Sequence, residues 1–172
     1  MRMIDAWLED YGDTHRNPVN KTIHRIAVPI IVLDVLGLLH IVPTAGLLPG
    51  APNAAVVVTL AALVFYARLS MVLTLGMALL SAAGLALVAG AHAALGAWFL
   101  PSLVAVFVAA WIAQFVGHSI EGRKPSFFED VQFLLIGPLW LLADVYRRLG
   151  IRYSDDGGRD AARGSAPASI AA

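Results

Sequence analysis

Four long runs of apolar residues dominate the chain, and short polar segments separate them. They cover residues 26–48, 54–66, 69–95 and 98–116. Within them, the only ionisable side chains that could carry charge near neutral pH are those of Asp34, His40 and His92. Each run approaches the roughly 20 apolar residues that a helix needs to cross the hydrocarbon core of a bilayer. The pattern predicts an all-α integral membrane bundle of about four transmembrane helices.

The N-terminal segment has a different pattern, with apolar residues on one side only. Apolar and aromatic side chains recur at i, i+3, i+4 and i+7, namely Ile4, Trp7, Leu8 and Tyr11. This spacing predicts an amphipathic helix over residues 2–16. Trp and Tyr suit the headgroup layer, so we expect the helix to lie on the membrane surface. Asn17 and Pro18 then indicate the N-cap and first residue of the next helix.

The C-terminal part predicts one more helix and a tail. Residues 131–143 are apolar but too few to span a bilayer, and Gly137-Pro138 interrupts them. We interpret this segment as an interfacial or re-entrant helix. Residues 1–153 are expected to form a single helical membrane domain. Gly, Ala, Ser and Arg dominate residues 154–172, which predict a disordered tail.

The composition agrees with an apolar environment. Hydrophobic residues make up 59% of the chain and charged residues 14%, against about 25% charged in soluble domains. A net charge of zero gives no indication of a nucleic-acid partner. The chain has no cysteine, which excludes disulfides, thiolate metal sites and cysteine nucleophiles. A transition metal would therefore need histidine and carboxylate ligands.

The basic residues predict an orientation in the membrane. All 12 Lys and Arg lie before the first run, between the second and third, or after the fourth. The connections at residues 43–53 and 90–97 contain none. With four spans, every basic residue lies on one side, which the positive-inside rule makes cytoplasmic. We expect a multi-pass protein of a bacterial inner membrane or endoplasmic reticulum, with both termini in the cytoplasm.

The same topology divides the five histidines into two groups. His15, His24 and His118 lie at the cytoplasmic ends of the first and fourth runs. His40 follows His24 by 16 residues, or about 24 Å along a helix, and His92 is similarly far from His118. We therefore do not expect one site made of all five. His40 and His92 are interpreted as structural side chains.

Spacing within the cytoplasmic group favours a metal site. Three pairs share a helix face at i, i+4: Tyr11 and His15, Asn20 and His24, and Gln114 and His118. A metal-bound imidazole usually gives its other nitrogen to an acceptor, and the side chains of Asn20 and Gln114 offer such oxygens. Glu121 lies one turn past His118, where its carboxylate could join as a ligand. Such a set suits non-haem Fe(II) or Zn(II).

The spacing alone leaves structural interpretations open. Histidines near an interface also serve as polar helix caps or headgroup contacts. Asp34 is an acid inside a span, so it either takes part in function or bonds a neighbouring helix. Arg123 and Lys124 are typical of positive-inside anchors, and binding of a substrate carboxylate is the alternative.

Two segments resemble a known family. The first runs from Tyr11 to His24 (YGDTHRNPVNKTIH) and is followed by Val28-Pro29. The second runs from Trp111 to Pro125 (WIAQFVGHSIEGRKP) and is followed by Gly137-Pro138. Both combine His, Asn, Gly and Pro at fixed offsets beside membrane spans. Together they resemble the membrane 2-hydroxy fatty acid dioxygenase family, over residues 7–149.

The resemblance implies an iron-dependent membrane enzyme that uses dioxygen to shorten long-chain 2-hydroxy fatty acids by one carbon. His15, His24 and His118 match the family's motif histidines and would be the Fe(II) ligands. Glu121 and Arg123 would complete the catalytic site, with Arg123 steering the substrate carboxylate. Three protein ligands leave room on the iron for a chelating 2-hydroxy acid and for dioxygen.

Two other functions remain as alternatives at this point. A zinc-dependent membrane hydrolase of a lipid amide or ester would use the same ligands, with Glu121 as general base. A small non-catalytic membrane protein would use the histidines only to cap helices. Oxygen consumption separates the two enzymes, and a purified sample without stoichiometric metal would favour the non-catalytic protein.

Overall fold

The computed structural model describes residues 4–13, 15–44, 53–122 and 132–154. In these parts the regular structure is helical, apart from one bridge between Pro43 and Asn53. The elements in chain order are α1 (Ile4–Asp13), α2 (Pro18–His40), α3 (Ala54–Ala67), α4 (Met71–Leu95), the short 3-10 turn η1 (Gly96–Trp98), α5 (Phe99–Glu121) and α6 (Gln132–Arg148). The predicted all-α class is confirmed for this part of the chain. The predicted disordered tail lies outside it, except for Ser154.

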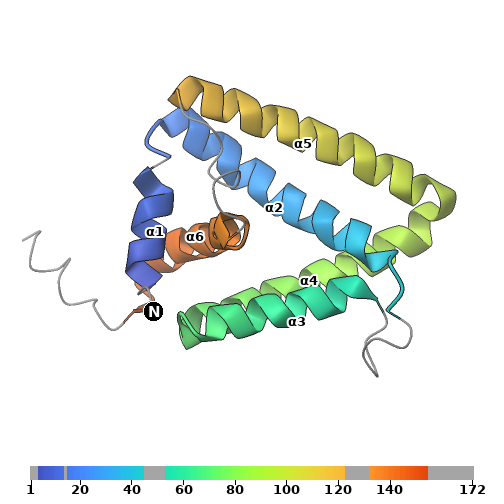
Figure 1. Ribbon diagram of the computed structural model, residues 1–172, viewed down its shortest axis with the longest axis horizontal. Helices are drawn as coiled ribbons and strands as arrows, with labels where there is room; N and C mark the ends of the chain where they lie inside the picture. Colours follow the sequence, from blue (N-terminus) through green and yellow to red (C-terminus); the bar gives the residue numbers. More distant parts are fainter. Residues whose placement is uncertain (1–3, 14, 45–52, 123–131, 155–172) are drawn as a thin grey trace, which may run out of the picture.

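Helix α2 is the centre of the arrangement and packs against α3, α4, α5 and α6. Figure 1 shows α5 running antiparallel beside α2, and α3 and α4 forming a second antiparallel pair. Helices α1 and α6 pack on each other at the end where α2 begins and α5 ends. Segments from both ends of the sequence therefore meet at this one end of the bundle.

The ends of α2 follow from local sequence. The Oδ1 atom of Asn17 accepts a hydrogen bond from the backbone N–H of Val19 at 2.9 Å, and Pro18 occupies the first helical position, as predicted. The helix ends at His40, ahead of Pro43, because a proline disfavours helical geometry in the residue before it. Helix α2 therefore begins and ends eight residues earlier in the sequence than the apolar run at 26–48. The last four residues of that run lie outside the described residues.

Two glycines allow α2 and α5 to approach closely. A Cβ atom added to Gly37 would lie 2.7 Å from Cδ2 of Leu103, and one added to Gly117 would collide with Oδ1 of Asn20. Small residues at such contacts let helix backbones come together. The contact at Gly117 places the first turn of α2 directly against the last turns of α5.

The amphipathic pattern of α1 is satisfied by α6. Ile4, Leu8 and Tyr11 are buried and belong to one apolar cluster with Ile136 and Leu139 of α6. Helix α6 itself is longer than the predicted segment 131–143 and continues through Gly137-Pro138 without a break. The apolar face predicted for α1 therefore packs on protein, and its burial there accounts for the pattern.

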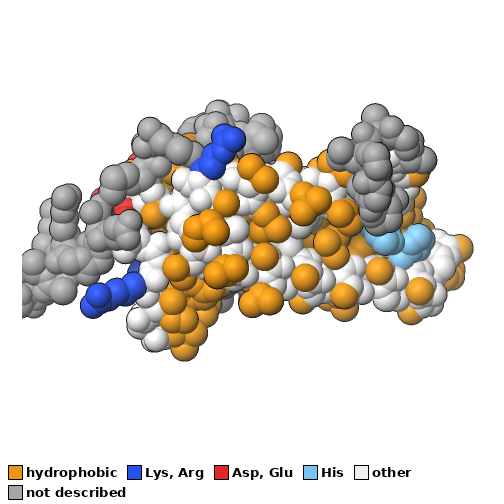
Figure 2. All heavy atoms as spheres, turned by 90° about the horizontal axis from the view of Figure 1, so that it is seen from below, with side chains coloured by type: hydrophobic (Ala, Val, Ile, Leu, Met, Phe, Trp, Pro, Cys, Tyr) orange, Lys and Arg blue, Asp and Glu red, His pale blue; other side chains and the backbone are white. Residues whose placement is uncertain are grey.

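The described helices present a large apolar surface. Helix α2 and the stretch Met71–Ile120, which comprises α4, η1 and all but the last residue of α5, are long and apolar enough to cross a membrane. Helix α3 is a shorter apolar helix. Leu79 and Trp98 are 75% and 73% exposed. Figure 2 shows hydrophobic side chains covering the middle of one face, with basic side chains toward one end and histidine at the other. Such a surface is costly in water and is typical of helices that contact lipid.

The close contact between α2 and α5 gives a stability prediction. Gly117→Ala is expected to lower the free energy of unfolding by about 1–3 kcal/mol, the usual cost of overpacking, because the added methyl group collides with Asn20. Gly90→Ala makes the same chemical change in α4 at a position with open space. It is expected to be neutral or slightly stabilising, since Ala favours helix. Thermal unfolding in detergent measures both variants, and equal melting temperatures would contradict the close contact.

Candidate metal centre

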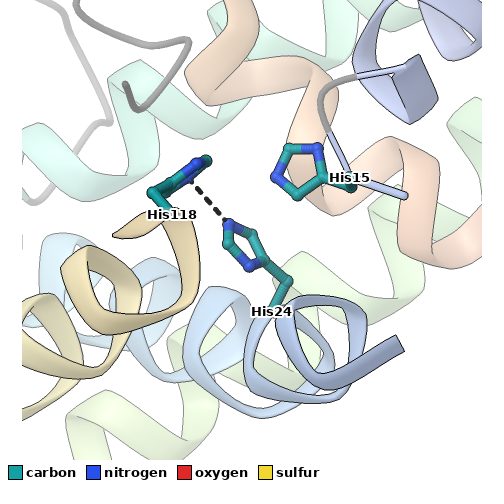
Figure 3. A group of neighbouring side chains, drawn as sticks. All are labelled: His15, His24 and His118. Atoms are coloured by element: carbon teal, nitrogen blue, oxygen red, sulfur yellow. Dashed lines mark hydrogen bonds between the residues drawn. The ribbon is translucent and has the colours of Figure 1, made fainter. Parts of the chain in front are cut away.

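Three histidines from separate parts of the sequence meet where α1, α2 and α5 come together. His15 lies in the short connection between α1 and α2, His24 lies near the start of α2, and His118 lies in the last turn of α5. All three are buried, with 0%, 2% and 5% of their surface exposed. Figure 3 shows the three rings converging. The structure thus brings together the three histidines that the sequence placed on one side of the membrane.

The ring nitrogens are close enough to share one ion. One nitrogen from each ring lies within 4.8 Å of the others. The Nε2 atoms of His24 and His118 are 3.2 Å apart. The rings meet edge to face, with interplanar angles of 67° to 89°, and none stacks on another. The rings therefore do not block one another by stacking, and one nitrogen of each remains near the other two.

Backbone carbonyls fix the proton on two of the rings. Nδ1 of His15 lies 2.7 Å from the carbonyl oxygen of Tyr11, and Nδ1 of His24 lies 3.0 Å from that of Asn20. A carbonyl oxygen only accepts, so each Nδ1 atom carries the proton and donates it. The Nε2 atom of each ring is then left with a lone pair. This is the tautomer in which Nε2 can bind a metal.

The spacing of one pair of nitrogens already fits a bound metal. Nitrogens bound to one ion at about 2.0–2.1 Å are separated by about 2.8–3.4 Å for angles between octahedral and tetrahedral. The Nε2 atoms of His24 and His118 fall in this range at 3.2 Å. Three imidazole nitrogens form a donor set that suits divalent iron and zinc. The residues present therefore fit a metal ion.

Aromatic packing from α1 and α6 supports His15. The ring of Tyr11 stacks on His15 with centroids 4.3 Å apart, and Trp140 packs against both rings. Burial raises the pKa of the Tyr11 phenol well above its ordinary value, so this group stays neutral. A Cβ atom at Gly137 would lie 2.9 Å from the Tyr11 hydroxyl oxygen, so this glycine makes room for the stack. Helix α6 thus covers the side of the cluster on which His15 and Tyr11 lie.

Comparison with known proteins assigns the chain to a family. A family model described as "2-hydroxy-palmitic acid dioxygenase Mpo1-like" matches residues 1–149. The chain belongs to this family. The match includes all three clustered histidines, and it confirms the resemblance carried by the two sequence motifs. No curated protein and no solved structure gave a significant match. The Mpo1-like family is named for dioxygenase activity on a 2-hydroxy fatty acid.

The structure agrees only in part with the roles predicted for the residues around the histidines of this Mpo1-like chain. The acceptor for His24 is the backbone carbonyl of Asn20, whereas the sequence suggested its side-chain oxygen. Gln114 is buried one turn before His118, and its Oε1 atom has no hydrogen-bond partner among the described residues. Helix α5 extends to Glu121, which places that residue one turn after His118. The Glu121 side chain and the whole of Arg123 lie outside the described part.

The second histidine group lies at the opposite end of the bundle, as predicted. The rings of His40 and His92 are 5.2 Å apart, and Nδ1 of His40 lies 3.1 Å from the amide nitrogen of Asn53. Asp34 lies between the two histidine groups along α2 and is buried. The role of Gly137 and Trp140 behind His15 was not predicted, because it depends on how α6 packs on α1.

Removal of a clustered histidine is expected to weaken metal binding strongly. His118→Ala is expected to lower the affinity for Fe(II) by more than about 100-fold. Loss of a residue that only hydrogen-bonds to a metal ligand costs up to about 100-fold, and loss of a ligand itself should cost more. His92→Ala, in the other histidine group, is the matched control and is expected to bind Fe(II) like the unaltered protein. Metal content after anaerobic loading measures both. Equal loss of metal in the two variants would contradict a site at the cluster.

Proposed function

We propose that this protein is an Fe(II)-dependent membrane dioxygenase. In this proposal it performs α-oxidation of long-chain 2-hydroxy fatty acids to fatty acids one carbon shorter. The observation that carries the proposal is the buried triad of His15, His24 and His118 in a chain of the Mpo1-like family. The family's name supports the substrate and the reaction class, and the triad supports a metal-dependent site.

The three histidines would hold the iron through their ring nitrogens. Bound iron would supply the activation of dioxygen, for which amino-acid side chains have no equivalent. The carbonyls of Tyr11 and Asn20 hold the rings of His15 and His24 in one orientation and one tautomer. Tyr11 and Trp140 cover His15 and keep water from that side. The protein thus preorganises the site and excludes competing reactions.

The proposed reaction needs no external reductant. A 2-hydroxy acid and one dioxygen molecule give the shorter fatty acid, carbon dioxide and water. Oxidation of the hydroxyl-bearing carbon supplies three electrons, and release of the carboxyl carbon as carbon dioxide supplies one. These four electrons reduce dioxygen completely, with one of its oxygen atoms leaving as water. A site with iron, substrate and dioxygen is therefore sufficient.

Two residues after the triad complete the proposal. Glu121 follows His118 by one helical turn, so we assign it as the acidic group beside the metal. Arg123 follows α5 and is assigned to attract the substrate carboxylate. The side chains of both lie outside the described residues, so the assignments rest on the motif and on the helix that leads to it.

We further propose that the bundle crosses the membrane four times through α2, α3, α4 and α5. The antiparallel order of these helices supports this proposal, in which the metal centre lies at one membrane face. Basic residues gather at that end, which makes it cytoplasmic by the positive-inside rule. The polar head of the substrate can then reach the metal while its acyl chain stays in an apolar environment.

The decisive experiment measures oxygen uptake. Protein in detergent, loaded anaerobically with Fe(II), is expected to consume dioxygen with 2-hydroxyhexadecanoate and to release pentadecanoate. Hexadecanoate, which lacks the hydroxyl group, is the control substrate and is expected to give no uptake. His118→Ala is expected to lose both iron and uptake.

Two outcomes would overturn the assignment. Bound metal without oxygen uptake, together with cleavage of a lipid ester or amide by the zinc-loaded protein, would indicate a hydrolase. Full oxygen uptake in His118→Ala would show that the reaction does not depend on the triad. Mass spectrometry of the product separates loss of one carbon from simple oxidation of the hydroxyl group.

A further inference from the structure

A groove separate from the histidine cluster lies between α2, α4 and α6. Its volume is about 780 Å³, within the range of small-molecule sites. The walls are formed almost entirely by apolar side chains, among them Val32, Leu36, Leu80 and Leu141. An apolar cavity of this size accepts a flexible hydrocarbon chain and offers little to a polar ligand.

The groove extends along the helices from their basic end. On α2 its walls run from Arg25 to Leu36, which is about 16 Å along the helix axis. Helix α4 follows the same course, and a Cβ atom at Gly84 would lie 3.3 Å from both Leu33 and Leu36. This length and narrow shape suit one acyl chain lying parallel to α2.

The mouth of the groove carries an excess of positive charge. The carboxylate of Asp144 contacts three guanidinium groups, those of Arg25 at 3.4 Å, Arg147 at 3.4 Å and Arg148 at 3.1 Å. Arg25, Arg148 and Asp144 line the groove, so its lining carries a net charge of +1 at this point, and Arg147 lies beside it on α6. The three arginine side chains are 43%, 54% and 63% exposed, so they remain accessible to an anionic group.

The mouth also lies beside the metal centre. Arg25 follows His24 directly, and Val28, which lines the groove, lies one helical turn after His24. On α6, the groove residue Pro138 follows Gly137, which contacts Tyr11. The same turns of α2 and α6 therefore build the histidine cluster on one side and the groove on another.

We propose that this groove binds the acyl chain of a single-chain amphiphile with an anionic head, a long-chain carboxylate. The chain lies along α2 between α4 and α6, and the arginines at the mouth draw the carboxylate to the end of the groove beside the histidines. This proposal deepens the proposed function, on which its biological meaning rests, because it gives the substrate tail a defined place. The apolar walls of the groove fit the acyl chain, and the positive charge at its mouth fits the carboxylate.

Blocking the groove tests the proposal without any metal. Ser81 lines the groove about halfway along α4, and Ser81→Trp would fill it there. Ala86→Trp, on an exposed part of the same helix outside the groove, is the matched control. Binding of radiolabelled 2-hydroxyhexadecanoate and 2-hydroxyoctanoate to metal-free protein in detergent is measured for both variants.

The expected result is a change in chain-length preference. Methylenes displaced from the groove lose their contacts with its walls, so Ser81→Trp is expected to weaken binding of the long chain more than that of the short one. Ala86→Trp is expected to keep the preference for the long chain. The proposal is overturned if the two variants show the same preference for the long chain over the short one. It is also overturned if phospholipid co-purifies in the groove and 2-hydroxyhexadecanoate does not displace it.

Removal of charge at the mouth gives an independent test that does not introduce a bulky residue into the bundle. Arg25→Gln with Arg148→Gln is expected to weaken binding of 2-hydroxyhexadecanoate by about fivefold per arginine and to leave binding of neutral hexadecanol unchanged. Arg16→Gln, which removes an exposed arginine paired with Asp13 on α1, is the control and is expected to change neither. Equal weakening of acid and alcohol would overturn the role of charge.

The two proposals fail in different ways. If metal-free protein binds the carboxylate in the groove but iron-loaded protein consumes no oxygen, the dioxygenase function is wrong and the groove stands. If iron-loaded protein consumes oxygen but Ser81→Trp and Ala86→Trp prefer the long chain equally, the proposed role of the groove is wrong and the dioxygenase function stands.

Discussion

The close antiparallel contact between α2 and α5 is the constraint on which the candidate metal centre depends. Gly117 has no side chain, so the first turn of α2 can lie directly against the last turns of α5. That approach brings Nε2 of His24 to within 3.2 Å of Nε2 of His118. A bulkier residue at position 117 would separate the helices and the nitrogens together. Helix packing and ligand geometry are therefore one property of this bundle.

Hydropathy was sufficient to predict the main helices and the division of the histidines. Long apolar runs mark helices strongly, and the alternating direction of successive helices then fixes which histidines share an end. His40 and His92 meet at one end, and His15, His24 and His118 at the other. This much follows from spacing along the chain, without knowledge of any side-chain contact.

Other features depend on tertiary packing that no local pattern records. The amphipathic pattern of α1 does not say whether lipid or protein covers its apolar face, and the structure shows that α6 covers Ile4, Leu8 and Tyr11. Gly137 interrupts an apolar run in the sequence, and in the structure it makes room for Tyr11 inside a continuous α6. Asn20 contributes its backbone carbonyl to His24, and sequence spacing cannot separate that oxygen from the side-chain oxygen.

The sequence separation of the three histidines has a consequence for biogenesis. His24 and His118 are 94 positions apart, and His118 lies in the last of the long apolar helices. A nascent chain that has formed only its earlier helices lacks His118, so the three histidines come together only when the bundle is nearly assembled. Because metal binding at such a site is coupled to folding, an ion bound there would hold the first and last long helices together. Loading with metal would then be the final step in the maturation of this protein.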